Sequence, residues 1–267
     1  MAASALRRTA LALGLAVLAM FGPQGARADA EVDLALVIGV DISYSMDMDE
    51  LALQRQGFAE AFRAAQVHDA IRRGMLGKIA VVYFEWAGAW DQRVVVPWTV
   101  LDGPDSAGSF AEKVAAQPVR RAQRTSISGA IDFGMKLLGE SGVEATRRVM
   151  DISGDGPNNQ GRPVVSARNE AVAQGVTING LPVMLKSPGY LDIPALDVYY
   201  RDCVIGGQGA FVVPVREREQ FPNAIKTKIL LEIAGLAPPV PLVQRVQGAA
   251  PTDCMIGEQQ WRNRMGN

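Results

Sequence analysis

The chain has 267 residues and an apolar fraction of 48%, which is enough for one large domain with a buried core and argues against intrinsic disorder. Its 27 Lys and Arg residues nearly balance its 28 Asp and Glu residues, so the formal net charge is −1 and no basic excess favours nucleic acid as a partner. Two cysteines and the single histidine His68 exclude a disulfide-rich scaffold, a cysteine-based zinc site and most histidine-dependent catalysis.

The first 30 residues have the pattern of a secretory signal peptide. Two arginines precede an apolar run at residues 9–21, and small side chains at Ala28 and Ala30 favour cleavage before Glu31. The apolar run is shorter than the roughly 20 residues of a membrane-spanning helix, so an uncleaved anchor is the alternative. We therefore expect residues 1–30 to be removed, no stable membrane span to remain, and the protein to be periplasmic or secreted.

Short apolar runs alternate with amphipathic stretches between residues 31 and 234, which is typical of a parallel sheet with crossover helices. A continuous apolar run at residues 34–40 predicts a strand that is buried on both faces. The sequence thus predicts a doubly wound α/β domain over residues 31–234, with a mostly parallel sheet of about six strands, one antiparallel edge strand and helices on both faces. The expected strands are residues 34–40, 79–84, 92–96 (the antiparallel edge strand), 148–152, 176–184 and 210–215.

Helical periodicity fills the intervals between these strands. Apolar residues fall on one face of a helix over residues 51–65, and Asp47 followed by Glu50 predicts a capping box at its start. Five further helices are expected around Phe110 and Val114, Ile127 to Leu138, Val165 and Val172, Leu196 and Tyr200, and Phe221 to Ile229.

The end of the chain differs in composition from the domain before it. Residues 235–252 are rich in proline and have no helical period, so we expect them to be extended, within a Pro-rich C-terminal tail over residues 235–267. Cys203 and Cys254 are the two cysteines, and disulfides persist in the oxidising compartments to which a signal peptide leads. We expect them to pair and to tether the tail to the domain; two unrelated buried thiols are the alternative.

Three polar loops are expected at one edge of the sheet, because ligands of open α/β sheets bind beyond the carboxyl ends of the strands. Asp41, Ser43 and Ser45 alternate directly after the first apolar run. Asp155 follows a later run beside two glycines, and Thr125 stands at the start of a predicted helix. The five side chains would converge on one point that is rich in oxygen atoms.

These motifs resemble the metal-ion-dependent adhesion site of the von Willebrand factor A family, in which Asp-x-Ser-x-Ser is joined by a Thr from a second loop and Asp-Gly from a third. The match covers about residues 31–234, and the stretch at residues 153–159 is similar to an uncharacterised, exported bacterial branch of that family. The resemblance implies a Rossmann-like fold. It further implies direct metal oxygens from Ser43, Ser45 and Thr125, and ligation directly or through water by Asp41 and Asp155.

Hydroxyl, carboxylate and water oxygens are hard ligands, which suit Mg²⁺, Mn²⁺ or Ca²⁺, and we expect Mg²⁺. Only two protein carboxylates would face the cation, so an Asp or Glu of a protein partner has room to complete its coordination. The sequence therefore predicts an exported protein-binding module and not an enzyme. Tyr44, Trp90, Pro157 and Asn158 are candidate partner contacts at the rim. Hairpin packing is the alternative for Trp90, and a plain turn is the alternative for Pro157 and Asn158.

Two other functions are compatible with the same residues. A metal-dependent phosphoryl-transfer enzyme would use Asp41 as nucleophile, but such enzymes usually carry a second acid two residues later, where this chain has Ser43. The second alternative is a structural domain with an empty site, in which Asp41, Ser43 and Ser45 form a turn and Thr125 caps a helix.

Overall fold

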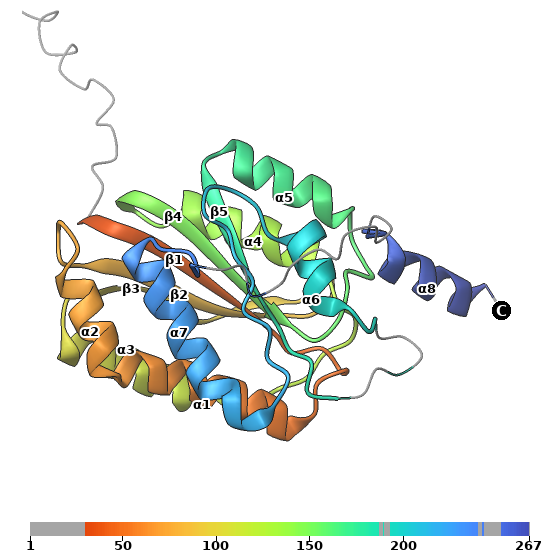
Figure 1. Ribbon diagram of the computed structural model, residues 1–267, viewed down its shortest axis with the longest axis horizontal. Helices are drawn as coiled ribbons and strands as arrows, with labels where there is room; N and C mark the ends of the chain where they lie inside the picture. Colours follow the sequence, from red (N-terminus) through yellow and green to blue (C-terminus); the bar gives the residue numbers. More distant parts are fainter. Residues whose placement is uncertain (1–29, 187–188, 190–192, 240–241, 243–251, 267) are drawn as a thin grey trace, which may run out of the picture.

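The computed structural model describes residues 30–186, 189, 193–239, 242 and 252–266. Its centre is a five-stranded sheet in the order β3-β2-β1-β4-β5, in which β3 is the antiparallel edge strand and the other four strands are parallel (Figure 1). This arrangement confirms the predicted mixed α/β sheet. The strands are β1 (Ala30–Asp41), β2 (Ile79–Trp86), β3 (Gln92–Leu101), β4 (Val143–Gly154) and β5 (Val176–Pro182).

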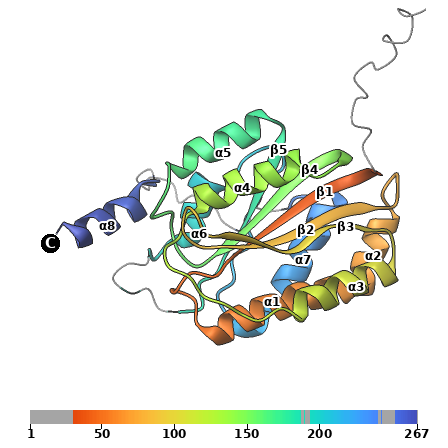
Figure 2. The same ribbon diagram turned by 180° about the vertical axis from the view of Figure 1, so that it is seen from behind.

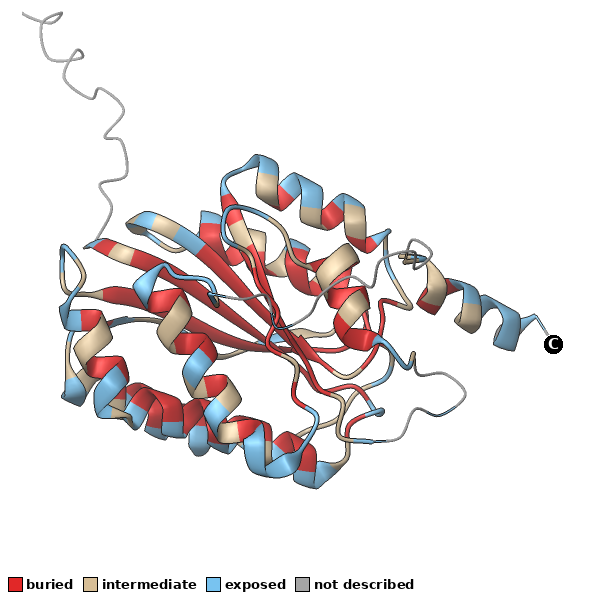
Figure 3. Cartoon of the chain, in the orientation of Figure 1, coloured by how far each residue is buried: buried red, intermediate tan, exposed pale blue. Residues whose placement is uncertain are grey.

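Helices cover both faces of the sheet (Figures 1 and 2). The apolar run of β1 contributes to the hydrophobic cores on both faces of the sheet, because successive side chains of a strand point to opposite faces. Leu36 packs toward one helical layer, and Val37 packs toward the other. Figure 3 shows the result, with buried residues along the strands and on the inward helix faces. One layer contains α1 (Met48–Arg63), α2 (Ala65–Arg72), α3 (Pro104–Ala115) and α7 (Phe221–Ala234); the other contains α4 (Ile127–Gly139), α5 (Val164–Ala173), α6 (Leu196–Tyr199) and the π-helix η1 (Tyr200–Val204).

The predicted capping box at the start of α1 is confirmed. The Asp47 carboxylate accepts from the Glu50 backbone N–H at 2.8 Å, and the Glu50 carboxylate accepts from the Asp47 backbone N–H at 2.9 Å. These bonds satisfy N–H groups that have no partner inside the helix. They also fix the direction in which the chain leaves the loop after β1.

The prediction of a sixth strand at residues 210–215 is wrong. This segment runs beside β5 but forms only isolated bridges, such as Gly180 with Val212. The backbone N–H of Val213 donates to Gly180, and that of Val215 donates to Pro182. Pro182 has no N–H, so it cannot donate a backbone hydrogen bond to residues 210–215. The pairing between β5 and this segment is therefore interrupted where β5 ends.

The Cys203–Cys254 pairing is confirmed, with the two Cα atoms 5.5 Å apart. The disulfide joins Cys203 of η1 to Cys254, which lies two residues before α8 (Ile256–Met265). The sequence analysis did not predict this helix. Of the stretch expected to be extended, at residues 235–252, residues 240, 241 and 243–251 lie outside the described residues. In Figures 1 and 2, α8 lies at one end of the molecule, apart from both helical layers.

The predicted signal peptide lies outside the described residues, apart from Ala30. Among the helices in the described ranges, none is long and apolar enough to cross a membrane.

Candidate metal centre

The loops that were predicted to converge meet at the carboxyl edge of the sheet. β1 ends at Asp41 and β4 ends at Gly154, and these two strands pair in parallel at the centre of the sheet. The segment before α4 joins them, since the Ala122 backbone N–H donates to Ile42 at 2.9 Å. Adjacent parallel strands bring the residues after them to one place, which is why the three motifs lie together.

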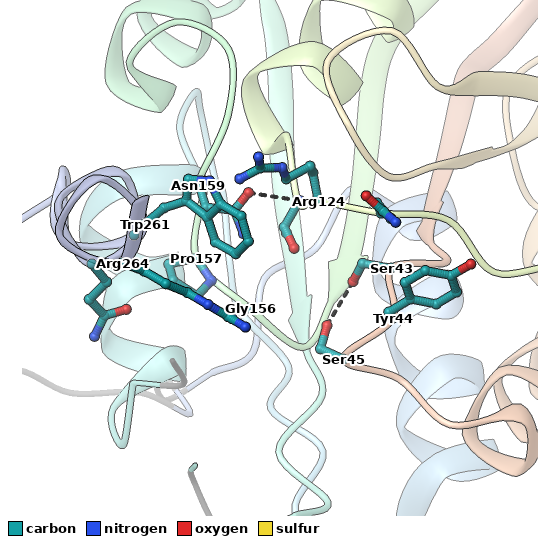
Figure 4. A pocket seen from close by; sticks show the side chains of 13 residues that line it. Ser43, Tyr44, Ser45, Arg124, Gly156, Pro157, Asn159, Trp261 and Arg264 are labelled. Carbon is teal, nitrogen blue, oxygen red and sulfur yellow. Dashed lines mark hydrogen bonds between the residues drawn. The ribbon is translucent and has the colours of Figure 1, made fainter. Parts of the chain in front are cut away.

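A chain of hydrogen bonds connects the first and third motifs. The Ser43 and Ser45 hydroxyls are 2.7 Å apart, and the Ser45 hydroxyl donates to Asp155 Oδ1 at 2.5 Å. Ser45 and Asp155 are 110 positions apart in the sequence. The structure therefore brings together three of the five predicted ligand side chains through direct contacts, and Figure 4 shows the one between Ser43 and Ser45.

Asp41 has the least satisfied side chain of this group. It is fully buried, its Oδ1 accepts from the Ser43 backbone N–H at 2.7 Å, and its Oδ2 has no hydrogen-bond partner among the described residues. Burial and the charge of Asp155 raise the pKa of Asp41 well above its usual value. A buried, unpartnered carboxylate oxygen is costly, and a cation in front of it would remove the cost.

Gly154, the last residue of β4, leaves room for the carboxylate of Asp41. A Cβ atom at residue 154 would lie 2.8 Å from Asp41 Oδ2 and 3.0 Å from the Tyr200 hydroxyl. Both distances are below ordinary contact, so a side chain larger than glycine would displace the carboxylate. The Tyr200 hydroxyl is buried without a hydrogen-bond partner within the described part of the chain, and burial raises its pKa.

Thr125 faces the same region from the second loop and is not a helix cap. It is buried, and a Cβ atom built on Gly156, the residue after Asp155, would lie 3.7 Å from its hydroxyl oxygen. The cap of α4 is Ser126, whose hydroxyl accepts from the Gly129 backbone N–H at 3.1 Å. The Thr125 hydroxyl is therefore not needed by the helix.

Asn159 holds Thr125 against the third loop, a role that the sequence analysis did not assign to it. Its side-chain oxygen accepts from the Thr125 backbone N–H at 3.0 Å, and its own backbone N–H donates to the Thr125 carbonyl at 2.8 Å. This reciprocal pair fixes the spacing of the two loops. The Gly-Pro-Asn-Asn turn at residues 156–159 is the signal that pointed to it, but a turn sequence does not name the partner of each amide.

The donor set fits a hard divalent cation. Asp41 and Asp155 supply carboxylates, and Ser43, Ser45 and Thr125 supply hydroxyls, all from loops that the backbone holds in place. Within the described ranges, no group of three or more His, Cys, Asp and Glu side chains has the arrangement of a metal site. A cation here would thus depend on hydroxyl oxygens, which suit Mg²⁺, Mn²⁺ or Ca²⁺ better than a soft metal ion.

The four candidate rim residues differ in exposure. Tyr44 is 55% exposed and Trp90 is 94% exposed, so both side chains are accessible to a partner. Pro157 is buried but lines the pocket described below. Asn158 is fully buried and is a correction: its side-chain N–H donates to Glu258 at 2.7 Å, and its oxygen accepts from the Ser128 backbone N–H at 2.9 Å.

A pocket of about 570 Å³ opens beside the candidate ligands. One wall is formed by the loop after β1 and the opposite wall by α8, with Arg124 and the loop after β4 between them (Figure 4). Trp261 and Arg264 of α8 were missed, because the segment around them has no apolar period and its place depends on contacts with residues far away in the sequence.

Comparison with known proteins gives a family match over most of the described domain. The family described as "Protein of unknown function (DUF1194)" matches residues 31–237, so the match ends before α8. No curated protein matches the chain.

Solved structures of von Willebrand factor A domains share the fold. A von Willebrand factor type A protein from Catenulispora acidiphila has 15% identity and a TM-score of 0.53, covering 76% of this chain and 43% of that one. The von Willebrand factor domain of the type V pili tip protein Mfa5 from Porphyromonas gingivalis has 11% identity and a TM-score of 0.54, covering 78% and 98%. These similarities confirm the predicted fold.

A third similar structure is that of proximal thread matrix protein 1 from the mussel byssus, described as having a zinc-occupied MIDAS motif. It has 13% identity and a TM-score of 0.53, covering 76% of this chain and 49% of that one. The chain therefore spans about half the length of that protein.

Proposed function

The chain belongs to the DUF1194 family and has a von Willebrand factor A fold, and from this premise we propose that it is an exported module that binds a protein partner through a divalent cation. The proposed ligands are Asp41, Ser43, Ser45, Thr125 and Asp155. The observation that carries the proposal is the buried Oδ2 atom of Asp41, which has no hydrogen-bond partner among the described residues. Asp41 is the last residue of β1, directly before the loop that contains the Ser43–Ser45 hydroxyl pair.

Mg²⁺ is the proposed cation, with Mn²⁺ and Ca²⁺ as alternatives, because every proposed ligand atom is a hard oxygen. Two carboxylates balance the charge of one divalent ion without enclosing it, since the remaining ligands are neutral hydroxyls and water. The zinc-occupied MIDAS motif of the mussel protein supports the view that this fold can hold a divalent cation at such a motif. A bound cation would offer a coordination position to a ligand in the pocket.

A carboxylate of a partner protein would take that position. An Asp or Glu side chain is a hard anionic ligand and is favoured over water by its charge. Exposed Tyr44, at the rim of the same pocket, offers an aromatic surface to the rest of the partner. The disulfide supports an oxidising location, so we place the protein in the periplasm or outside the cell.

Catalysis by Asp41 receives less support than binding. The side chain is fully buried and one of its oxygens is engaged by the Ser43 backbone N–H, which leaves little room for in-line attack on a phosphoryl group. We therefore propose a non-enzymatic role. A structural domain with an empty site is the remaining alternative, and it differs from the proposal in predicting no dependence of binding on metal.

Capture of partners from a native extract tests the proposal. Immobilised protein should retain a partner in Mg²⁺, release it on addition of chelator and regain it when Mg²⁺ is restored. Asp41→Ala should abolish the retention, whereas Asp105→Ala, which removes an exposed carboxylate in the first turn of α3, should leave it intact. Retention that ignores both chelator and Asp41→Ala contradicts a cation bridge.

A further inference from the structure

Two arginines and a tryptophan line the pocket (Figure 4). Trp261 and Arg264 lie on the wall formed by α8, opposite Ser43 and Ser45, and Arg124 lies between the two walls. The guanidinium of Arg124 lies 3.6 Å from the centre of the Trp261 ring, and that of Arg264 lies 5.3 Å from the same centre. Neither arginine forms an ion pair with a carboxylate in the part of the chain that the structure describes. Two cations that share one ring without an acid between them favour the approach of an anion.

Arg124 has an unusual backbone for its residue type. It is the one non-glycine residue with positive φ in the described ranges, at 75°. Glycine adopts this left-handed conformation without the cost that a side chain incurs. Arg124 precedes the proposed ligand Thr125 in the sequence, and in this conformation its guanidinium lies over the Trp261 ring.

The α8 helix is fixed against the loops of the candidate site. A Cβ atom at Gly257 would lie 2.2 Å from the Asn158 carbonyl oxygen, so only a glycine permits this approach. Buried Glu258 accepts from the Asn158 side chain at 2.7 Å, and the disulfide of Cys254 holds the chain just before the helix. These contacts make the arginine-bearing wall a part of the pocket.

We propose that the pocket binds an acidic segment of the protein partner through two carboxylates, one on the cation and the second on Arg124 and Arg264, with its chain packed on Trp261. This inference rests on the proposed function and specifies the partner that the site selects. The pocket volume of about 570 Å³ lies within the range of about 300–1,000 Å³ that is typical of ligand sites. Carboxylates pair with guanidinium groups through charge-assisted hydrogen bonds, which select a second acid over a neutral side chain.

Binding of capped peptides tests the proposed contact between the second carboxylate and the guanidinium groups of Arg124 and Arg264. The probes are acetylated and amidated pentapeptides with two glutamates at separations of one to three residues, and the same peptides with one glutamate replaced by glutamine. In Mg²⁺, the best two-acid peptide should bind about tenfold or more tightly than its one-acid partner. The double variant Arg124→Gln/Arg264→Gln should remove this difference and leave the one-acid affinity unchanged. Arg262→Gln, an exposed arginine of α8 outside the pocket lining, should preserve the difference.

The outcomes separate this inference from the function on which it rests. Equal affinity of one-acid and two-acid peptides in the unmodified protein, with both lost on chelation, overturns the second contact and leaves the cation bridge in place. Two-acid selectivity that persists in chelator supports the arginine contact and contradicts the cation bridge. Free glutarate that binds as tightly as the two-acid peptide contradicts a peptide segment as the ligand. Hydrogen exchange of the α8 amides that matches the unmodified protein confirms that the arginine variants keep α8 in place.

Discussion

The substitution Gly257→Ala sets helix propensity against packing at the contact between α8 and the candidate site. Alanine in a helix is favoured over glycine by up to about 1 kcal/mol. At this position, however, the added Cβ would lie 2.2 Å from the Asn158 carbonyl oxygen and 3.0 Å from its carbonyl carbon. Close C–H···O contacts have carbon–oxygen distances of about 3.3–3.6 Å, so the two backbones must separate by about 1 Å.

Overpacking of this kind typically costs about 1–3 kcal/mol, which exceeds the gain in propensity. We expect α8 to detach from the loop after β4, because the separation also stretches the 2.7 Å bond from Asn158 to Glu258. Hydrogen exchange of the α8 amides should accelerate, and Trp261 fluorescence should change as the ring leaves the Arg124 guanidinium. The β1 and β4 amides should keep their protection, because the core does not involve this contact.

Gly108→Ala is the matched control, because Gly108 lies within α3 and an added Cβ has no heavy atom within 4 Å. That variant should gain up to about 1 kcal/mol in the free energy of unfolding. Unchanged α8 exchange and Trp261 emission in Gly257→Ala would refute the reasoning that close packing holds this helix in place.

Two further predictions concern stability. Replacing Cys203 and Cys254 by serine removes a crosslink between residues separated by 51 positions, and the chain-entropy model gives a loss of about 4 kcal/mol in urea unfolding; a loss below about 1 kcal/mol contradicts it. Burial raises the pKa of Glu232 to about 7, so its stabilising contribution is complete below its unfolded value near 4.5 and is lost as the pH rises through 7. Between pH 5 and pH 8 the unmodified protein should therefore lose up to about 3 kcal/mol relative to Glu232→Gln, and parallel stability profiles would show that Glu232 is not buried beside Lys228.

The sheet and the ligand loops were predictable because their signals are local. The run at residues 34–40 is apolar at every position but Gly39, which only a strand buried on both faces explains, and it is the central strand of the sheet. Asp41, Ser43 and Ser45 follow it directly, so their place at the carboxyl edge was set once the strand was recognised. The capping box of Asp47 needed only residues within one helical turn.

Contacts between distant residues account for what was missed. Asn158 was expected at the rim, but Glu258, 100 positions later, supplies an acceptor that draws it into the interior. The α8 helix has no apolar stripe, and the disulfide, the Gly257 contact and the Arg124–Trp261 stack hold it in place. Pro182 interrupts the bonding between β5 and residues 210–215 because it has no N–H to donate, and the pattern of a single strand does not show which neighbour each N–H faces.

Calorimetric titration of chelator-treated protein with Mg²⁺, Mn²⁺ and Ca²⁺ tests the central claim most directly. We predict saturable binding at one site for at least one of these cations, lost in Asp41→Ala and in Asp155→Ala and retained in Asp105→Ala. Binding that survives both site variants, or no saturable binding of any of the three cations at millimolar concentration, would contradict a metal centre formed by these loops.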